Sequence, residues 1–175
     1  DVNGELTDLR EVLVEGSKVS FLTFAEDGGK HAFRHTASHV MAQAVKRLWP
    51  DAQLAIGPVI ENGFYYDIDM EHKLVPEDLP KIEAEMSRIV KENLPIEKVS
   101  MERQEALDFF AAKHENYKVE LINDLPADAV ISAYKQGEFT DLCAGPHLAS
   151  TGKVKAFKLQ SIAGAYWRGD EKNKM

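Results

Sequence analysis

The sequence predicts an α+β fold: an antiparallel sheet packed against a central helix and further helices, with a small β-rich piece at the N-terminus. Segments of helical periodicity alternate with short extended segments in no regular strand–helix–strand order, which argues against a parallel sheet. Glycine-containing turns separate consecutive extended segments, as in antiparallel hairpins. With 44% hydrophobic and 29% charged residues among 175, the chain can bury the core of an ordinary domain.

The N-terminal part predicts a separate β segment. Apolar and polar residues alternate over 10–14 and 18–24, the pattern of half-buried strands. The run Glu26-Asp27-Gly28-Gly29 then indicates a turn or linker. We therefore expect two units, 1–29 and 30–175.

Helices are expected at four places. Apolar residues recur at helical spacing over 32–49, where Pro50 ends the pattern, and over 76–94, which opens on proline and acidic residues. The segments 101–114 and 119–123 predict two more helical pieces. Because it is long and strongly periodic, 32–49 is expected to be the central helix.

The remaining extended segments predict strands. Asn62-Gly63 suits the positive φ values of a tight hairpin turn, and Gly137 marks a second hairpin. The expected strands are 53–60 paired with 63–69, then 96–100, 130–135 paired with 138–142, and 155–162.

Charge and composition restrict the class of partner. The net charge of −8 argues against a surface that wraps nucleic acid, although residues 150–175 carry six basic groups against two acidic ones, so a local polynucleotide contact is compatible. No apolar run is long enough to cross a bilayer, no signal-peptide pattern is present, and one cysteine excludes an internal disulfide. We expect a cytoplasmic protein with no membrane partner.

The most informative pattern is a spacing of four that occurs twice. His35 and His39 lie on one face of the central helix, because residues i and i+4 are neighbours there. Cys143 and His147 repeat the spacing, but a Gly-Pro pair between them predicts a turn. The four side chains form a candidate site.

Two chemistries suit this set. Three imidazoles and a thiolate are the ligands of a tetrahedral Zn²⁺, which can ionise a bound water. Without metal, a histidine can take a proton from water, Asp141 can hold that histidine or the water, and a lysine can stabilise a developing oxyanion. The residues alone leave both alternatives open.

Ordered motifs along the chain resemble the editing domain of bacterial-type threonyl-tRNA synthetases. The motifs are His35-Thr36-Ala37-Ser38-His39, Gly57-Pro58, Asn62-Gly63-Phe64-Tyr65-Tyr66-Asp67, Asp141-Leu142-Cys143-Ala144-Gly145-Pro146-His147 and Ala163-Gly164-Ala165-Tyr166-Trp167-Arg168-Gly169-Asp170. The match begins near residue 30, and residues 1–29 resemble the closing strands of the family's TGS domain. The resemblance implies that the family continues beyond residue 175 into an aminoacylation domain.

The resemblance implies hydrolysis of seryl-tRNA formed by mistake on the threonine tRNA. One methyl group separates serine from threonine and contributes only about 1–3 kcal/mol in a binding pocket, so a second, hydrolytic pocket is needed. It also implies contact with the acceptor end of tRNA(Thr), a seryl ester substrate, and a homodimeric full-length enzyme. An editing pocket of this type needs no cofactor.

The resemblance also implies individual roles. His35 would be the general base or water positioner, Lys118 would stabilise charge, and Asp141 would bind the seryl amine or hydroxyl. The residues that would shape the pocket and flank the substrate are His39, Tyr66, Cys143 and His147.

Zinc binding is the main alternative. Relatives that edit alanyl-tRNA hold zinc with the groups that correspond to His35, His39, Cys143 and His147. A zinc-dependent alanyl-type hydrolase and a non-catalytic tRNA-docking module are therefore the competing interpretations. We expect the metal-free form, because Lys118 in the site would repel Zn²⁺ by about 4 kcal/mol per unit-charge pair at 4 Å and intermediate screening.

Overall fold

A computed structural model gives the structure of the chain and describes residues 1–172. The helices are α1 (Asp27–Leu48), α2 (Leu79–Glu92), α3 (Arg103–Ala112) and α4 (Asn116–Asp124), with short 3-10 turns η1 (Pro76–Asp78), η2 (Thr151–Lys153) and η3 (Trp167–Gly169). The strands are β1 (Gln53–Leu54), β2 (Val59–Ile60), β3 (Gly63–Phe64), β4 (Ile68–Asp69), β5 (Ile96–Met101), β6 (Ile131–Gln136) and β7 (Phe139–Leu142).

All strand pairs are antiparallel. β6 lies between β5 and β7 in a three-stranded sheet, and Gly137 makes the turn between β6 and β7 with a φ of 59°. In the region 53–69, β1 pairs with β4 and β2 pairs with β3, so this region is one hairpin with an interruption. The predicted α+β fold with antiparallel pairing is confirmed.

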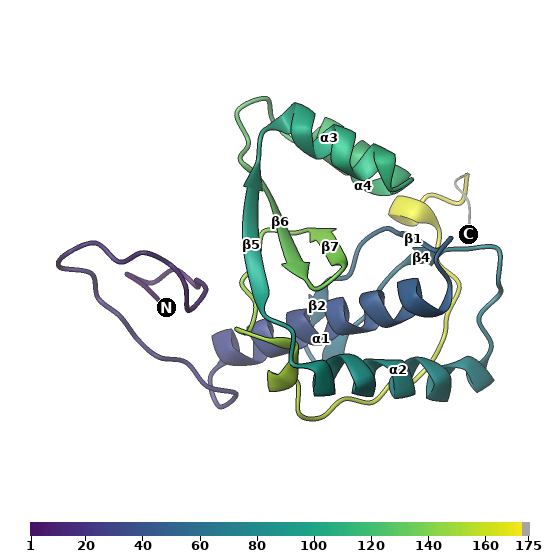
Figure 1. The fold of residues 1–175 in the computed structure, drawn as a ribbon, viewed down its shortest axis with the longest axis horizontal. Coiled ribbons are helices and arrows are strands. Elements are labelled where there is room, and N and C mark those ends of the chain that lie inside the picture. The colour runs from purple at the N-terminus through teal and green to yellow at the C-terminus, as the bar shows by residue number, and fades with distance from the viewer. Residues whose placement is uncertain (173–175) are drawn as a thin grey trace.

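Helix α1 runs through the middle of the molecule. Figure 1 shows α2 beside it on one side, the β5–β7 sheet on the other, and α3 with α4 beyond the sheet. Because α1 has neighbours on more than one side, it buries polar residues such as His39 and Gln43 as well as apolar ones. The helix that carries His35 and His39 therefore lies between two layers of the fold.

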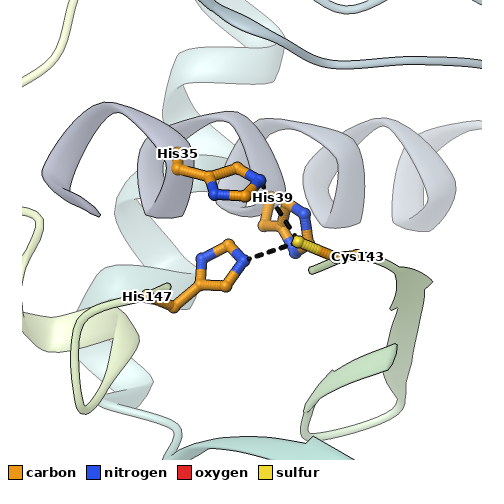
Figure 2. Close-up of side chains that lie close together, drawn as sticks. All are labelled: His35, His39, Cys143 and His147. Carbon is orange, nitrogen blue, oxygen red and sulfur yellow. Dashed lines mark hydrogen bonds between the residues drawn. The ribbon is translucent and has the colours of Figure 1, made fainter. Parts of the chain in front are cut away.

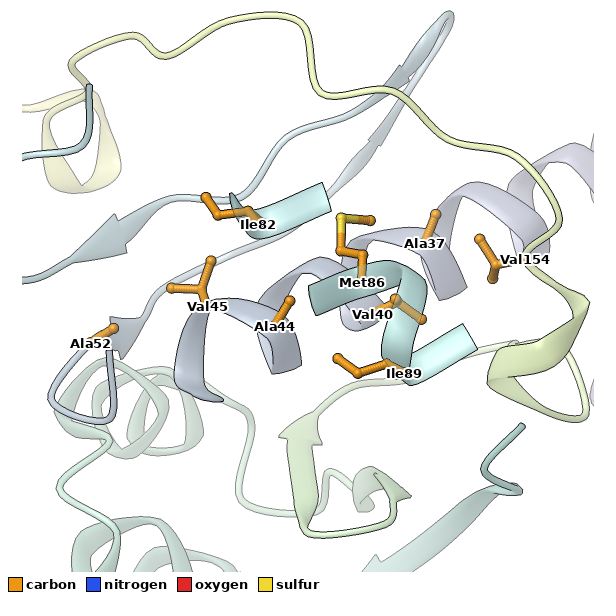
Figure 3. Close-up of a cluster of buried hydrophobic side chains, with 9 residues drawn as sticks. All are labelled: Ala37, Val40, Ala44, Val45, Ala52, Ile82, Met86, Ile89 and Val154. Atoms are coloured by element: carbon orange, nitrogen blue, oxygen red, sulfur yellow. The ribbon is translucent and has the colours of Figure 1, made fainter. Parts of the chain in front are cut away.

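An apolar core fastens α1 to α2. Figure 3 shows its buried members: Ala37, Val40, Ala44, Val45, Ala52, Ile82, Met86, Ile89 and Val154. Each large aliphatic side chain here contributes about 1.5–3 kcal/mol by leaving water. This packing fixes the rotation of α1 and so decides which face of the helix points to the sheet.

Arg47 joins three elements near the end of α1. Its guanidinium contacts Glu92 at 2.7 Å and Glu85 at 3.2 Å on α2, and Glu138 at 2.6 Å beside the β6–β7 turn. The hydrogen bond from Arg47 is the main cause that lowers the pKa of Glu138 to about 2. α1, α2 and the sheet are thus held in one arrangement.

Two predicted strand regions are wrong. No residue of 10–14 forms a β-bridge, and within 18–24 Val19 forms an isolated bridge with Val2. Val12, Val14 and Phe21 are exposed, because no strand among residues 1–172 pairs with these two segments. Residues 155–162 are extended but unpaired: Leu159 donates its amide proton to Glu83 on α2 at 2.7 Å. Alternating hydrophobicity marked an extended chain there, but the partner is a helix.

The turns near α1 and in the first hairpin also differ from expectation. α1 begins at Asp27, so the glycines expected in a linker lie in its first turn. Asn62 does not take the positive φ expected for a tight turn, and Gly63 has φ 158° instead. The predicted helices at 76–94, 101–114 and 119–123 are present, the last extending over all of α4. The division into units 1–29 and 30–175 stays a prediction.

Candidate functional site

Helix α1 and the turn after β7 bring the four predicted side chains together. Figure 2 shows His35 and His39 projecting from α1 toward Cys143 and His147. One ligand atom from each of these residues lies within 4.8 Å of the others. His39 and His147 are 3% and 4% exposed. We call these four residues the neutral cluster.

The thiol of Cys143 is the centre of this cluster. Its Sγ atom lies 3.2 Å from Nε2 of His35 and 3.2 Å from Nε2 of His147. The amide of Gly145 also donates to Sγ at 3.2 Å. Gly145 has a φ of 80°, and a Cβ there would lie 2.0 Å from the hydroxyl of Tyr134, so this turn requires glycine.

Thr36 fixes the tautomer of His147. Its hydroxyl donates to the carbonyl of Ala32 at 2.8 Å, accepts from the amide of Leu148 at 2.9 Å, and lies 3.2 Å from Nδ1 of His147. Since the only hydroxyl proton is used, Nδ1 of His147 must be the donor in that contact. The lone pair of His147 is therefore on Nε2, toward the thiol.

Burial keeps the neutral cluster uncharged. Desolvation is the main cause that lowers the pKa of His35, His39 and His147, and each of them also feels neighbouring histidines. Desolvation raises the pKa of the Cys143 thiol to about 12. At neutral pH the cluster holds three imidazole bases and a protonated thiol.

A second set of three residues lies beside this cluster and contains an ion pair. The ammonium group of Lys118 on α4 pairs with Oδ1 of Asp141 at 2.8 Å and donates to the carbonyl of Ala55 at 2.8 Å and the hydroxyl of Tyr66 at 3.1 Å. The Tyr66 hydroxyl donates to Oδ2 of Asp141. Lys118 and Asp141 are 3% and 2% exposed. We call Lys118, Asp141 and Tyr66 the ionic triad.

The two sets meet at His39 and Asp141. Nε2 of His39 lies 3.7 Å from Oδ2 of Asp141. All seven predicted site residues are therefore in one region, although they come from α1, α4, the hairpin 53–69 and the segment that follows β6. Their chemical roles stay predictions.

The structure also distinguishes the two adjacent tyrosines. Tyr66 points into the site, and a Cβ on Gly57 would lie 2.3 Å from its ring, so glycine is needed at that close approach. Tyr65 is 44% exposed. The sequence alone left this choice open.

Sequence reasoning missed three residues that contact the site: Thr36, Tyr134 and Asp8. Thr36 lies between two motif positions, and its β-branched hydroxyl in a helix was a usable signal. Tyr134 packs against His147 with 4.5 Å between ring centroids, and Asp8 accepts from the amide of His147 at 2.8 Å. Neither showed any local pattern, because both reach the site from distant parts of the chain.

The donor set fits a tetrahedral metal ion. Bonds of about 2.0–2.1 Å to nitrogen and 2.3 Å to sulfur imply nitrogen–sulfur separations of about 3.6 Å, close to the two 3.2 Å contacts of Cys143. The argument that Lys118 repels zinc is weaker than the sequence implied, because Asp141 compensates its charge at 2.8 Å.

Comparisons with known proteins agree with the motifs. The family model described as "Threonyl and Alanyl tRNA synthetase second additional domain" matches residues 131–175. The threonine–tRNA ligase of Clostridioides difficile is 61% identical over 174 residues, which are 99% of this chain and 27% of that protein. The threonine–tRNA ligase of Acetivibrio thermocellus is 61% identical over 175 residues, 100% of this chain and 28% of that protein.

The chain spans little more than a quarter of the length of these relatives. The match to the family model begins at β6 and includes Asp141, Cys143 and His147. Among residues 1–172, no helix combines the length and the apolar character that crossing a membrane requires.

Proposed function

This chain is homologous over its whole length to a segment of the threonine–tRNA ligases, the editing region, and on that premise we propose that it hydrolyses the ester of seryl-tRNA(Thr). The relatives support an editing role connected with tRNA. The seryl ester, the acceptor end of tRNA(Thr) as partner and the homodimeric full-length enzyme are part of the proposal.

One observation carries the proposal: a neutral base lies beside a buried carboxylate. Nδ1 of His35 is buried, and the backbone carbonyl of Pro146 is the polar group that acts on this imidazole besides the cluster itself. In the proposal a water molecule takes the place of Pro146 as the hydrogen-bond partner of His35 when substrate is bound. Because its pKa is lowered, His35 is unprotonated at neutral pH and can take the proton of that water. The water then attacks the ester carbonyl. When the tetrahedral intermediate collapses, the bond from the acyl carbon to the ribose oxygen of tRNA breaks, and the His35 imidazolium returns its proton to that oxygen.

The ionic triad supplies the complementary charge. The substrate of an aminoacyl ester hydrolase carries an ammonium group, which the carboxylate of Asp141 can bind. Lys118 is the cation available to a developing oxyanion, but its three protons face Asp141, Ala55 and Tyr66 in this structure. Lys118 must give up one of these partners when it stabilises the transition state.

Selection for serine follows from size in this proposal. The site is enclosed by the rings of His35, His39 and His147, whose centroids are 4.2–5.2 Å apart, and by Tyr66. A hydroxymethyl group is smaller than the side chain of threonine by one methyl. A pocket that rejects the extra methyl by overlap can discriminate more strongly than one that only gains from filling.

A zinc-dependent hydrolase is the second candidate, because the four donor atoms converge within 4.8 Å. His35, His39, Cys143 and His147 would hold the ion, and the ion would lower the pKa of a bound water. In that case the neutral cluster would be a ligand set, and the proton transfer would fall to another group.

Deacylation of seryl-, threonyl- and alanyl-tRNA, with and without a strong chelator, tests both candidates. The proposal expects seryl ester to be cleaved faster than the other two, and at the same rate after chelation. Loss of turnover on chelation and its recovery with Zn²⁺ would establish the second candidate. Binding of tRNA without cleavage of any ester would leave only a docking role.

A further inference from the structure

A hydrogen-bonded connection links the N-terminal segment to the site. The carboxylate of Asp8 accepts from the amide of His147 at 2.8 Å with one oxygen and from the hydroxyl of Tyr134 with the other. The residues that it joins lie on the turn after β7 and on the central strand β6. We infer that Asp8 and Tyr134 are positioning residues that hold the Cys143–His147 turn in place for the hydrolysis proposed above.

Tyr134 supports the turn from beneath. It is 2% exposed, and its ring lies 4.5 Å from the ring of His147 between centroids. The absence of a side chain at Gly145 lets the turn rest directly on the Tyr134 hydroxyl. The ring therefore limits how far His147 and Cys143 can move toward β6.

Asp8 holds the turn through its hydrogen bond to the amide of His147. Its neighbour Arg10 donates to the carbonyls of Ile96 and Ala149, which fastens the segment to the start of β5 and to the chain just after His147. The side chain between them, Leu9, is 75% exposed. Asp8 and Arg10 thus face the domain and Leu9 faces away from it, so the contact depends on two specific polar side chains and not on apolar packing.

The two oxygens of the Asp8 carboxylate match two hydrogen-bond donors, one on the turn and one on β6. The turn needs an acceptor for the His147 amide, and the buried Tyr134 hydroxyl needs an acceptor for its proton. One carboxylate with two oxygens satisfies both. An alanine at position 8 leaves both donors without this partner, whereas an asparagine keeps an acceptor for the His147 amide and loses the acceptor for the Tyr134 hydroxyl.

The reactivity of the Cys143 thiol reports how firmly the turn is held, because Cys143 is the single cysteine of the chain. The rate of its alkylation by iodoacetamide at one fixed pH is expected to rise about 3- to 10-fold in Asp8→Ala and in Tyr134→Phe, the range that one lost hydrogen bond allows. The double variant is expected to react no faster than the faster single variant, since both changes break the same connection. Glu15→Ala and Tyr65→Phe, which alter exposed groups, are the matched controls.

The variant Asp8→Asn distinguishes the hydrogen bonds of Asp8 from the effect of its negative charge on the Cys143 thiol. If the carboxylate acted only through its charge on the thiol, Asp8→Asn would react as fast as Asp8→Ala; we expect Asp8→Asn to react more slowly than Asp8→Ala, because it keeps the acceptor for the His147 amide. Tyr134→Phe keeps the ring and the charge of Asp8, so it tests the connection even if Asp8→Ala does not fold. Unchanged alkylation in Tyr134→Phe, with an unchanged far-UV dichroism spectrum, would overturn the inference.

A second readout follows deacylation of seryl-tRNA. We expect kcat to fall about 3- to 10-fold in Tyr134→Phe and in Asp8→Ala with KM nearly constant, and to fall less in Asp8→Asn than in Asp8→Ala. If the unaltered chain cleaves no ester, the proposed function fails, while the alkylation rates still decide whether Asp8 and Tyr134 hold the turn.

Discussion

The neutral cluster and the ionic triad are both buried, but the first consists of uncharged groups and the second contains an ion pair. In the cluster, burial lowers the pKa of three histidines and raises that of the thiol, so no member is charged at neutral pH. In the triad, Lys118 and Asp141 are equally buried but pair at 2.8 Å. Desolvation is the main cause acting on the four members of the cluster, whereas Lys118 and Asp141 form a direct ion pair.

In the proposed ester hydrolase, this difference assigns proton transfer to the neutral cluster and binding of the ammonium group to the ionic triad. A base must be unprotonated to accept a proton, and a binding group for an ammonium must remain ionised. Placing the base among uncharged groups and the carboxylate beside a cation would satisfy both requirements within one buried region. The following changes test this division, from the largest expected effect to the smallest.

Removal of the base should have the largest effect. We expect His35→Ala to lower the rate of seryl-tRNA deacylation about 10²- to 10⁴-fold, because a positioned general base typically contributes that factor. Far-UV dichroism and thermal melting should show a folded protein. The control is His114→Asn, which alters an exposed histidine. Normal turnover in His35→Ala, or an unfolded variant, would remove His35 from the proposed role.

Breaking the ion pair should mainly cost stability. Lys118→Ala leaves the Asp141 carboxylate buried without its cation, and we expect the free energy of unfolding to fall by about 3–5 kcal/mol in urea titrations. Deacylation should be lost as well. The double variant Lys118→Met with Asp141→Leu removes both charges and should be more stable than Lys118→Ala. Equal destabilisation by the single and double variants would show that packing, and not charge, explains the loss.

The hydroxyl of Tyr66 connects the two charges, and its removal should have a smaller effect. We expect Tyr66→Phe to reduce the free energy of unfolding by about 1.5–3 kcal/mol, because the hydroxyl bonds to charged partners, while Tyr65→Phe should change it little. The larger change Tyr66→Ala should also allow threonyl-tRNA to be cleaved if Tyr66 forms a wall of the pocket. Continued rejection of threonine would place Tyr66 in a purely structural role.

The stability of the fold should fall at acidic pH because of the histidines of the neutral cluster. Their pKa values in the folded chain lie below the unfolded value of about 6.5, so the unfolded state binds more protons as the pH falls. Their contribution is complete above pH 6.5 and is lost as the pH falls from there toward the folded values. We expect Tm, measured with chelator present, to fall between pH 6.5 and 5.

The carboxylate of Glu138 does not obscure this interval. Glu138 has its pKa lowered to about 2, and its contribution is lost only below the unfolded value of about 4.3. At the alkaline end, the thiol of Cys143 should make the folded state less stable as the pH rises from about 9 toward 12, because its folded pKa is raised. A Tm that is constant from pH 6.5 to 5 would show that the histidines are not buried as described.

Much of the fold followed from local patterns. The helices α1 and α2 and the hairpin around Gly137 were predicted from periodicity and turn residues, because those signals are repeated within each element. The strands expected at 10–14 and 155–162 failed for one reason. Alternation of apolar and polar residues describes which side of an extended chain is buried, but a strand also needs a neighbour to accept its hydrogen bonds.

The sequence by itself determined the chemistry of the site: the pair His35 and His39 on one helical face, the turn between Cys143 and His147, and the resemblance in which Lys118 and Asp141 had roles. Only the tertiary structure decided the charge of each group, because the pKa depends on burial and on neighbours that are distant in the chain. The tertiary structure also shows that Tyr66, and not Tyr65, lies in the site, and that Asp8 and Thr36 contact His147. Such contacts leave no local pattern, since they join segments whose approach is set by packing around α1.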